Sequence, residues 1–215
     1  MRITTLGTII TLFCWAAAER TEGGSSKCCE SPLVLDLEAN GIATTDIWYP
    51  VEFDIDGDGI LEYVSWTRWD AQDAFLCLDV NGNGCIDSGH ELFGNYSLTP
   101  DGMEHPNGFD SLAVYDQPAY GGNNDRRISS GDYVWDDLRL WLDLNHNGIS
   151  EPSELHCLNR FGLVWIGLVY VTLDEPVVDG NTNIFRHFSL FQRRVQGGRW
   201  LISMVWDMYP RVIDR

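Results

Sequence analysis

The chain has 215 residues, 44% of them hydrophobic, which is enough to bury the core of one domain. Its formal net charge is −18, from 32 acidic and 14 basic residues. Nucleic acid and anionic lipid require positive potential, so this balance argues against both as partners and favours cations. Acidity can also serve solubility alone. Here, however, the acidic residues gather in a few short segments.

The first 18 residues have the layout of a secretory signal peptide. A single basic residue, Arg2, precedes an apolar run that ends at Trp15 and three alanines at 16–18. We expect cleavage before Glu19; a retained anchor is the alternative, but the run is shorter than the roughly 20 residues of a membrane-spanning helix. Residues 19–31 are rich in glycine and serine and predict a flexible linker. Residues 32–215 then form one domain, expected to be a monomer that is secreted or periplasmic.

Cleavage would leave five cysteines, which is an odd number for an oxidising compartment. We expect Cys77 to form a disulfide with Cys85, and Cys28 or Cys29 to reach Cys157. The sequence contains no C-x-x-C pair, so a zinc site is not supported.

The predicted elements give an α+β fold. Short apolar runs at 33–35, 51–53 and 75–78 each lead into an acidic turn and predict strands. Residues 109–115 and 133–142 carry apolar residues at helical spacing, and another helix is expected to begin at Pro152. Residues 163–173, 184–191 and 200–208 predict C-terminal antiparallel strands. The centre is therefore expected to be an EF-hand-like helix–loop–helix. Within the domain, the EF-hand-like part would cover 32–162 and the β part 163–215.

The most informative pattern is an acidic or amide side chain at every second position, followed by glycine. Calcium takes six to eight oxygen ligands, and alternate positions of a tight loop direct side chains at one point while glycine permits the bend. Crowded carboxylates would also repel one another without a cation. Three segments show the pattern in full, and we expect each to hold Ca²⁺. The predicted ligands are Asp54, Asp56, Asp58, Ile60 and Glu62 in the first loop, Asp79, Asn81, Asn83, Cys85, Asp87 and Glu91 in the second, and Asp143, Asn145, Asn147, Ile149 and Glu154 in the third.

These three loops differ in how strongly they indicate a metal. The third spans twelve residues with glycine sixth and glutamate twelfth, which is the EF-hand spacing. The second contains Asn-Gly, which is also a signal for a plain β-hairpin. The first has more carboxylates than the second, so we expect it to bind calcium more tightly.

Two further segments are degenerate. The segment from Asp36 to Gly41 has the spacing but no acidic closing residue, so a turn without an ion is equally expected. In the other, a glycine-containing insertion separates the first acid from the rest, and Arg126 stands where the bend favours glycine. That second segment predicts a weak or empty site, with the ligands Asp116, Asn123, Asp125 and Asp132.

The repeated order of these loops, together with Glu91-Leu-Phe-Gly-Asn95 and Leu140-Trp-Leu-Asp143, resembles the EF-hand-like calcium-binding module of bacterial RTX, hemolysin-type exoproteins, in a small stand-alone form. The resemblance covers about residues 32–162 and implies calcium binding in an exported protein. Some RTX proteins carry a self-processing module that cuts an Asp-Pro bond. This sequence has no Asp-Pro dipeptide and no tandem glycine-rich nonapeptides, so neither self-cleavage nor a β-roll is expected.

No pattern predicts catalysis. The five histidines form no H-E-x-x-H motif, and G-x-S-x-G is absent, so we expect a structural or binding protein and not an enzyme. The nine tryptophans suggest an alternative, a calcium-dependent adhesin for glycans or a cell surface, although most of them are expected in the core. A calcium-dependent hydrolase is a further alternative.

Overall fold

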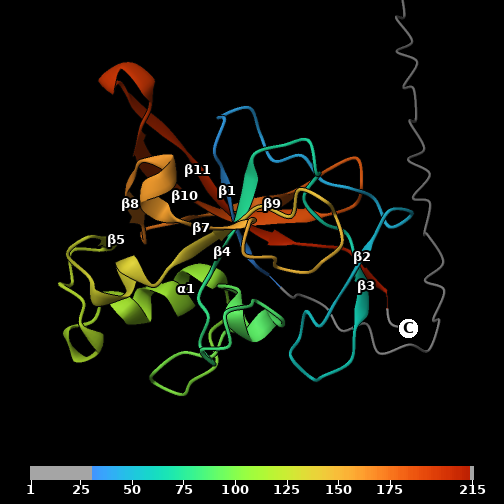
Figure 1. Ribbon diagram of the computed structural model, residues 1–215, viewed down its shortest axis with the longest axis horizontal. Coiled ribbons are helices and arrows are strands. Elements are labelled where there is room, and N and C mark those ends of the chain that lie inside the picture. Colours follow the sequence, from blue (N-terminus) through green and yellow to red (C-terminus); the bar gives the residue numbers. More distant parts are fainter. Residues whose placement is uncertain (1–30, 214–215) are drawn as a thin grey trace, which may run out of the picture.

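The computed structural model describes residues 31–213, and its fold is dominated by β-structure (Figure 1). The predicted signal peptide, most of the linker, Cys28 and Cys29 lie outside the described residues. The strands are β1 (Leu33–Asp36), β2 (Val51–Phe53), β3 (Glu62–Val64), β4 (Asp73–Cys77), β5 (Arg127–Ser129), β6 (Arg139–Trp141), β7 (Leu155–Cys157), β8 (Leu163–Gly167), β9 (Val171–Val178), β10 (Ile184–Arg194), β11 (Trp200–Tyr209) and β12 (Val212–Ile213). The helical segments are α1 (Gly108–Ala113) and the 3-10 turns η1 (Gly89–Glu91), η2 (Val114–Asp116), η3 (Pro118–Tyr120), η4 (Tyr133–Asp136), η5 (Leu158–Phe161) and η6 (Gln196–Gly198).

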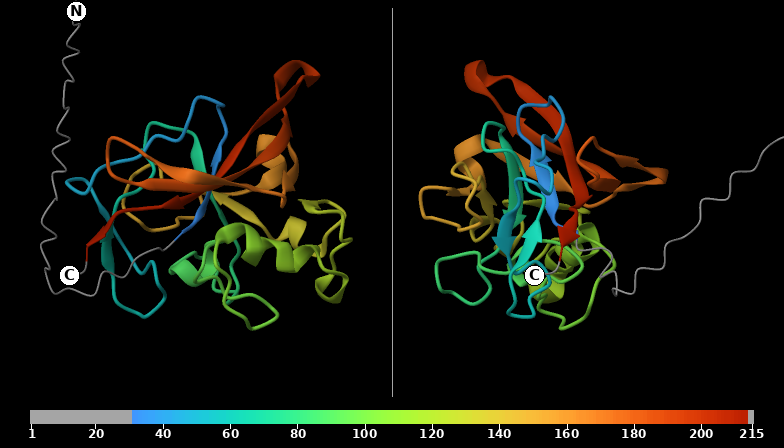
Figure 2. Two further views of the ribbon diagram at one scale, coloured as in Figure 1. Left: turned by 180° about the vertical axis from the view of Figure 1, so that it is seen from behind. Right: turned by 90° about the vertical axis from the view of Figure 1, so that its right-hand side faces the viewer.

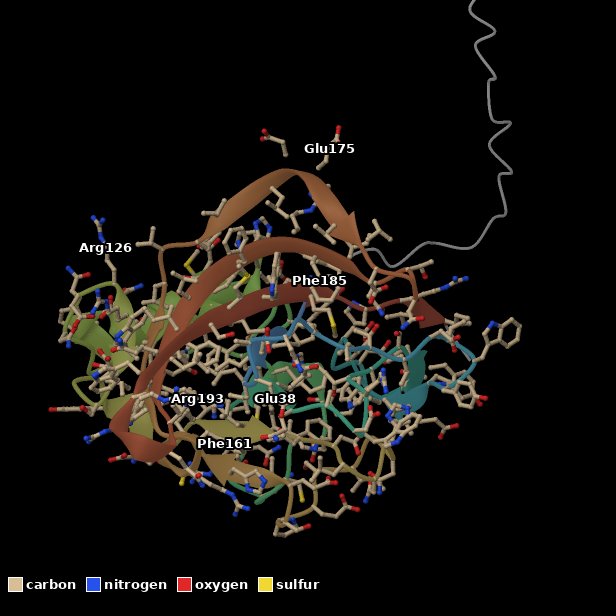
Figure 3. All side chains as sticks on the ribbon, turned by 90° about the horizontal axis from the view of Figure 1, so that it is seen from above. Glu38, Arg126, Phe161, Glu175, Phe185 and Arg193 are labelled. Carbon is tan, nitrogen blue, oxygen red and sulfur yellow. The ribbon has the colours of Figure 1, made fainter. Side chains whose placement is uncertain are left out.

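Nine strands form one antiparallel sheet in the order β5-β8-β10-β11-β1-β4-β6-β7, with β9 paired to β10. The long strands β10 and β11 bow across the molecule in Figure 3. The first strand of the domain, β1, lies between β11 and β4. The N-terminal and C-terminal parts of the domain therefore share one sheet. A smaller sheet, β12-β3-β2, packs beside it.

The central strands are buried on both faces. Leu33 and Leu35 of β1 point into a cluster that also contains Phe109 and Leu112 of α1. Between them, Val34 points into a second cluster with residues of the small sheet. Three rings, Trp66, Phe75 and Trp141, form much of this second core, and Trp66 lies 4.4 Å from Phe75 and 5.4 Å from Trp141. Alternate burial on two sides explains why these strands read as continuous apolar runs.

The predicted EF-hand-like centre is wrong, because the third loop joins two strands and not two helices. The segment 133–142 forms only the short turn η4 before it enters β6, where Leu140 pairs with Leu76 of β4. Its other flank, predicted to be a helix from Pro152, is a turn followed by β7, which pairs with β6. Pairing with β4 buries Leu140 in one core and Trp141 in the other, and this outweighs the helical spacing.

Other elements agree with the sequence. The helix expected at 109–115 is present as α1 continued by η2. Strands occur at the three N-terminal positions predicted, as β1, β2 and β4. The C-terminal run at 163–173 is divided between β8 and β9, and turns at 179–183 and η6 precede and follow β10. Within residues 31–213, no helix is long and apolar enough to cross a membrane.

The disulfide predicted between Cys77 and Cys85 is also wrong. Cys77 is the last residue of β4, fully buried, and its thiol donates to the carbonyl of Arg139 at 3.4 Å. Cys85 is exposed in the loop that follows, and both thiols are free, as is that of Cys157. The strand turns the Cys77 side chain into the core, away from the loop. The partner predicted for Cys157 lies outside the described residues.

Candidate metal centres

All five acidic loops share one backbone geometry. In each, the first aspartate accepts backbone N–H groups further along, and two residues near the bend have positive φ. Asp79 and Asp143 both accept from the N–H groups of the fourth and fifth residues after them, at 2.8 to 3.1 Å. The residues with positive φ in these loops are Ala39, Gly41, Gly57, Gly59, Gly82, Gly84, Asn124, Arg126, His146 and Gly148.

The degenerate loops keep this geometry. Asp36 accepts from Asn40 and Gly41, the fourth and fifth residues after it. Asp116 accepts from Asp125 and Arg126, the ninth and tenth residues, so an insertion of five residues leaves the bend unchanged. Arg126 stands where glycine was favoured and takes a left-handed φ of 66°. Such a conformation costs a residue with a Cβ roughly 1 to 2 kcal/mol.

In the first loop, three carboxylates meet. Ligand oxygens of Asp54, Asp56 and Asp58 lie within 4.8 Å of one another. Glu62, the first residue of β3, accepts the N–H of Ile55 through Oε2 at 3.1 Å and so closes the loop. Burial raises the pKa of Glu62, and the charges of the aspartates raise it further. The three aspartates therefore gather at one place, as the spacing predicted, and Glu62 lies near enough for their charges to act on it.

In the second loop, Glu91 is the closing residue. It belongs to η1, is buried, and accepts the N–H of Asp87 at 2.9 Å. Asn81 and Asn83 stay in the bend, where the amide of Asn83 donates to Asp87 at 2.7 Å. Burial, and then the charges of Asp87 and Asp79, raise the pKa of Glu91. The two-residue hairpin is not formed, because Leu78 and Glu91 bond across a much longer loop.

In the third loop, Glu154 plays the closing role. Its Oε1 accepts the N–H groups of Leu144 at 2.9 Å and Asn145 at 3.3 Å. Burial raises its pKa, as do the neighbouring carboxyl of Glu151 and the charge of Asp143. The side-chain amides of Asn145 and Asn147 both donate to Glu151, at 3.1 and 2.9 Å. Glu154 thus closes the loop on its second and third residues, although strands and not helices flank it.

Each of these three loops contains a buried carboxylate oxygen without a hydrogen-bond donor: Asp54 Oδ1, Glu91 Oε1 and Glu154 Oε2. The three side chains are 8%, 3% and 4% exposed. By contrast, both oxygens of Asp36 and both of Asp116 accept backbone N–H groups, as do both of Asp132. Buried polar atoms are nearly always paired, so an unpaired oxygen in each loop requires an explanation.

The three loops also touch one another. The N–H of Gly89, at the start of η1, donates to the carbonyl of Asp54 at 2.7 Å. The hydroxyl of Ser150 accepts the N–H of Ile86 at 2.6 Å and donates to its carbonyl at 3.0 Å. The first loop is thereby bonded to the second, and the second to the third.

The structure adds one acid that the spacing missed. Asp73 of β4 faces Asp36 across the β1–β4 pair, is 3% exposed, and accepts the N–H of Ala43 at 2.8 Å. Burial, and then the charges of Asp36 and Glu38, raise its pKa to about 7. Asp73 comes from a strand more than thirty residues after Asp36, so the residue spacing within the Asp36 loop could not predict it. The apolar run predicted at 75–78 begins two residues after it and gave no signal for the acid itself.

The comparisons with known proteins identify the class of domain. The family model for the SPM domain matches residues 33–200, which is most of the chain. The chain therefore belongs to the SPM domain family. A curated relative is the iron-regulated protein FrpA of Neisseria meningitidis serogroup C, which is 37% identical over 153 residues. That match covers 70% of this chain but 13% of FrpA, so the chain spans a small part of its relative's length.

Proposed function

We propose that this protein is an exported calcium-binding protein, in which Ca²⁺ ions held by the first three loops stabilise the fold. The observation that carries the proposal is the unpaired buried oxygen in each of these loops. Calcium is a hard cation that prefers carboxylate, amide and carbonyl oxygens, and those are the groups gathered there. A bound ion would supply the missing partner of each oxygen. It would also oppose the effects of burial and of neighbouring negative charge that raise the pKa of Glu62, Glu91 and Glu154.

The contacts between the loops give the ions a structural role. The third loop packs on the small sheet, where His146 bonds to the carbonyl of Tyr49 at 2.9 Å and Gly148 lies against Glu52. The third loop also joins β6 and β7 of the large sheet, so an ion that orders this loop would stabilise parts of both sheets. This supports a structural or binding module. Within residues 31–213, the group of acids close enough to hold a metal ion belongs to the first loop.

Calcium calorimetry on stripped protein tests the proposal. We expect three equivalents with dissociation constants of about 10⁻⁴ to 10⁻³ M, typical of extracellular modules. At free calcium about twenty times the dissociation constant, each site adds about 2 kcal/mol to the free energy of unfolding. The melting temperature should then fall by about 10 to 20 °C in EGTA. The absence of calcium uptake, with an unchanged melting curve, would refute the proposal.

Export is part of the same proposal and has its own test. The motivation is the apolar segment that precedes Glu19 in the sequence, together with the extracellular character of such calcium sites. We expect the protein in the periplasmic or extracellular fraction, with Glu19 as its N-terminal residue by sequencing. Recovery of the intact chain from the cytosol would contradict it.

A further inference from the structure

The hairpin formed by β10 and β11 carries a groove whose charge is opposite to that of the molecule. The hairpin projects beyond the rest of the fold, as Figures 1 and 2 show. The groove lies between its tip and η5 and has a volume of about 760 Å³. Its lining contains Arg160, Arg193, Arg194 and Arg199 and no acidic residue. Residues 31–213 contain ten arginines and no lysine, so four of the ten basic side chains gather here.

These arginines are not used to hold the fold together by ion pairs. In the described part of the chain, neither Arg160, Arg194 nor Arg199 forms a salt bridge, and all three are exposed. The Nε of Arg193 is buried without a hydrogen-bond partner. Arg193 and Phe161, which both line the groove, are labelled in Figure 3. The charges of Glu38 and Asp36 act on Arg193, whereas the other three arginines gather without an ion pair in the described residues. Such a gathering of like charges costs free energy and favours a ligand of opposite charge.

Backbone bonds fix the walls of this groove. The N–H of Arg194 donates to the carbonyl of Gly162 at 2.7 Å, which ties the hairpin to the end of η5. At the tip, the N–H of Val195 donates to the carbonyl of Arg199 at 2.9 Å. The guanidinium of Arg194 lies 5.8 Å from the ring centre of its cross-strand partner Trp200, which is 58% exposed. The main chain of the groove is therefore fixed, and the exposed ring of Trp200 lies beside one of its arginines, Arg194.

We propose that this groove binds an anionic sugar, a short glycan that carries sulfate or phosphate groups. Guanidinium groups bind such oxyanions through paired N–H donors, and an indole ring stacks on the apolar face of a sugar. The volume suits a small ligand and not an extended polymer. The net charge of −18 opposes anions over most of the surface, and this groove is the local exception. The proposal is independent of the metal loops, since none of their predicted ligands lines the groove.

The test is calorimetry of the calcium-loaded full chain with a heparin-derived sulfated tetrasaccharide, against its desulfated counterpart. We expect binding to the sulfated probe, weaker binding to the desulfated one, and a decrease in affinity as salt rises. Arg194→Gln/Arg199→Gln should reduce the affinity about tenfold or more, and Trp200→Ala should reduce it by a smaller factor. Arg68→Gln is the matched control, because Arg68 is exposed and pairs with Asp70 away from the groove; it should bind like wild type.

Two outcomes would overturn the proposal. One is a wild-type protein that binds neither probe. The other is an arginine variant, folded by circular dichroism, that binds the sulfated probe as tightly as wild type. A flotation assay with vesicles containing phosphatidylglycerol distinguishes the source of the anionic group. Vesicle binding that the tetrasaccharide displaces assigns it to a lipid headgroup, whereas tetrasaccharide binding alone assigns it to a soluble or cell-wall glycan.

Discussion

Leu144 and Glu154 are joined by a hydrogen bond that closes the third loop. The N–H of Leu144, the second residue of the loop, lies 2.9 Å from Oε1 of Glu154, the twelfth. The other oxygen of the same carboxylate, Oε2, is buried and has no donor. One oxygen of Glu154 thus holds the loop closed, and the second is the oxygen that we propose binds Ca²⁺.

The substitution Glu154→Gln tests this division of roles. It removes one charge and one oxygen ligand, so we expect calorimetry to find two calcium ions where the wild type binds three. The calcium-dependent gain in unfolding free energy should fall by about 2 kcal/mol. In EGTA the variant should be no less stable than wild type, because the repulsion between Glu154 and Asp143 is removed.

The matched control for this substitution is Glu175→Gln. Glu175 is exposed on β9, at the edge of the molecule in Figure 3, and should keep three ions. Full wild-type stoichiometry in Glu154→Gln would show that Glu154 is not a ligand.

Two glycines with similar backbone angles allow strain and steric contact to be separated. Gly57 and Gly84 have φ values of 77° and 85°, so alanine at either position costs about 1 to 2 kcal/mol. A Cβ at Gly84 would meet open space, whereas one at Gly57 would meet the ring of His90. We expect Gly57→Ala to lower the free energy of unfolding by about 1 kcal/mol more than Gly84→Ala in urea titrations with saturating calcium.

The variant Gly57→Ala/His90→Ala provides the second arm of that experiment. When the ring is absent, the added Cβ meets no steric obstacle. Gly57→Ala made in the His90→Ala background should therefore lower the free energy of unfolding by about the same amount as Gly84→Ala does in wild type. Equal losses in Gly57→Ala and Gly84→Ala would mean that the His90 ring moves aside at no cost.

The loops were predictable because their signal is local. Alternate acids, amides and glycines stand within nine to thirteen residues, and the first-aspartate hydrogen bonds form within five. Even Asp116, whose loop is interrupted, was identified from spacing, and its bend is retained. The closing residues Glu62, Glu91 and Glu154 were found for the same reason.

The flanking structure was not predictable, because it depends on partners far away in sequence. The segment with Leu138 and Trp141 fits a helical face equally well, and only pairing with β4, more than sixty residues earlier, makes it a strand. Asp73 was missed because it meets Asp36 across two strands. The expectation that most tryptophans lie in the core is only partly right. Trp66 and Trp141 are core residues, but Trp69 and Trp200 are exposed.

Cys77 offers a reporter for calcium-dependent stability. Its thiol is fully buried, and burial raises its pKa, so it reacts with iodoacetamide only when the fold opens. In a variant whose other cysteines are serine, we expect calcium to slow alkylation at least a hundredfold relative to EGTA, following the stability gained. A variant that keeps only the exposed Cys157 should react at a rate independent of calcium. Equal rates for Cys77 in both conditions would contradict a stabilising role for calcium.

Asp207 of β11 predicts a pH dependence that is separate from the metal loops. It is 0% exposed, and its Oδ1 accepts the N–H of Gly108 at 3.1 Å. Burial, with a contribution from the charge of Asp110, raises its pKa to about 7. Because the folded protein holds this proton more tightly than the unfolded chain, the contribution of Asp207 to stability is complete below about pH 4 and is lost as pH rises through about 7.

The variant Asp207→Asn removes this titration and keeps the acceptor for Gly108. The difference in unfolding free energy between variant and wild type should therefore grow in favour of the variant from pH 5 to pH 8. A shift of about three pKa units sets an upper limit of about 4 kcal/mol. Urea unfolding in saturating calcium across this range measures it, with the exposed Asp174→Asn as control. Parallel pH profiles for Asp207→Asn and wild type would mean that Asp207 stays ionised in the fold.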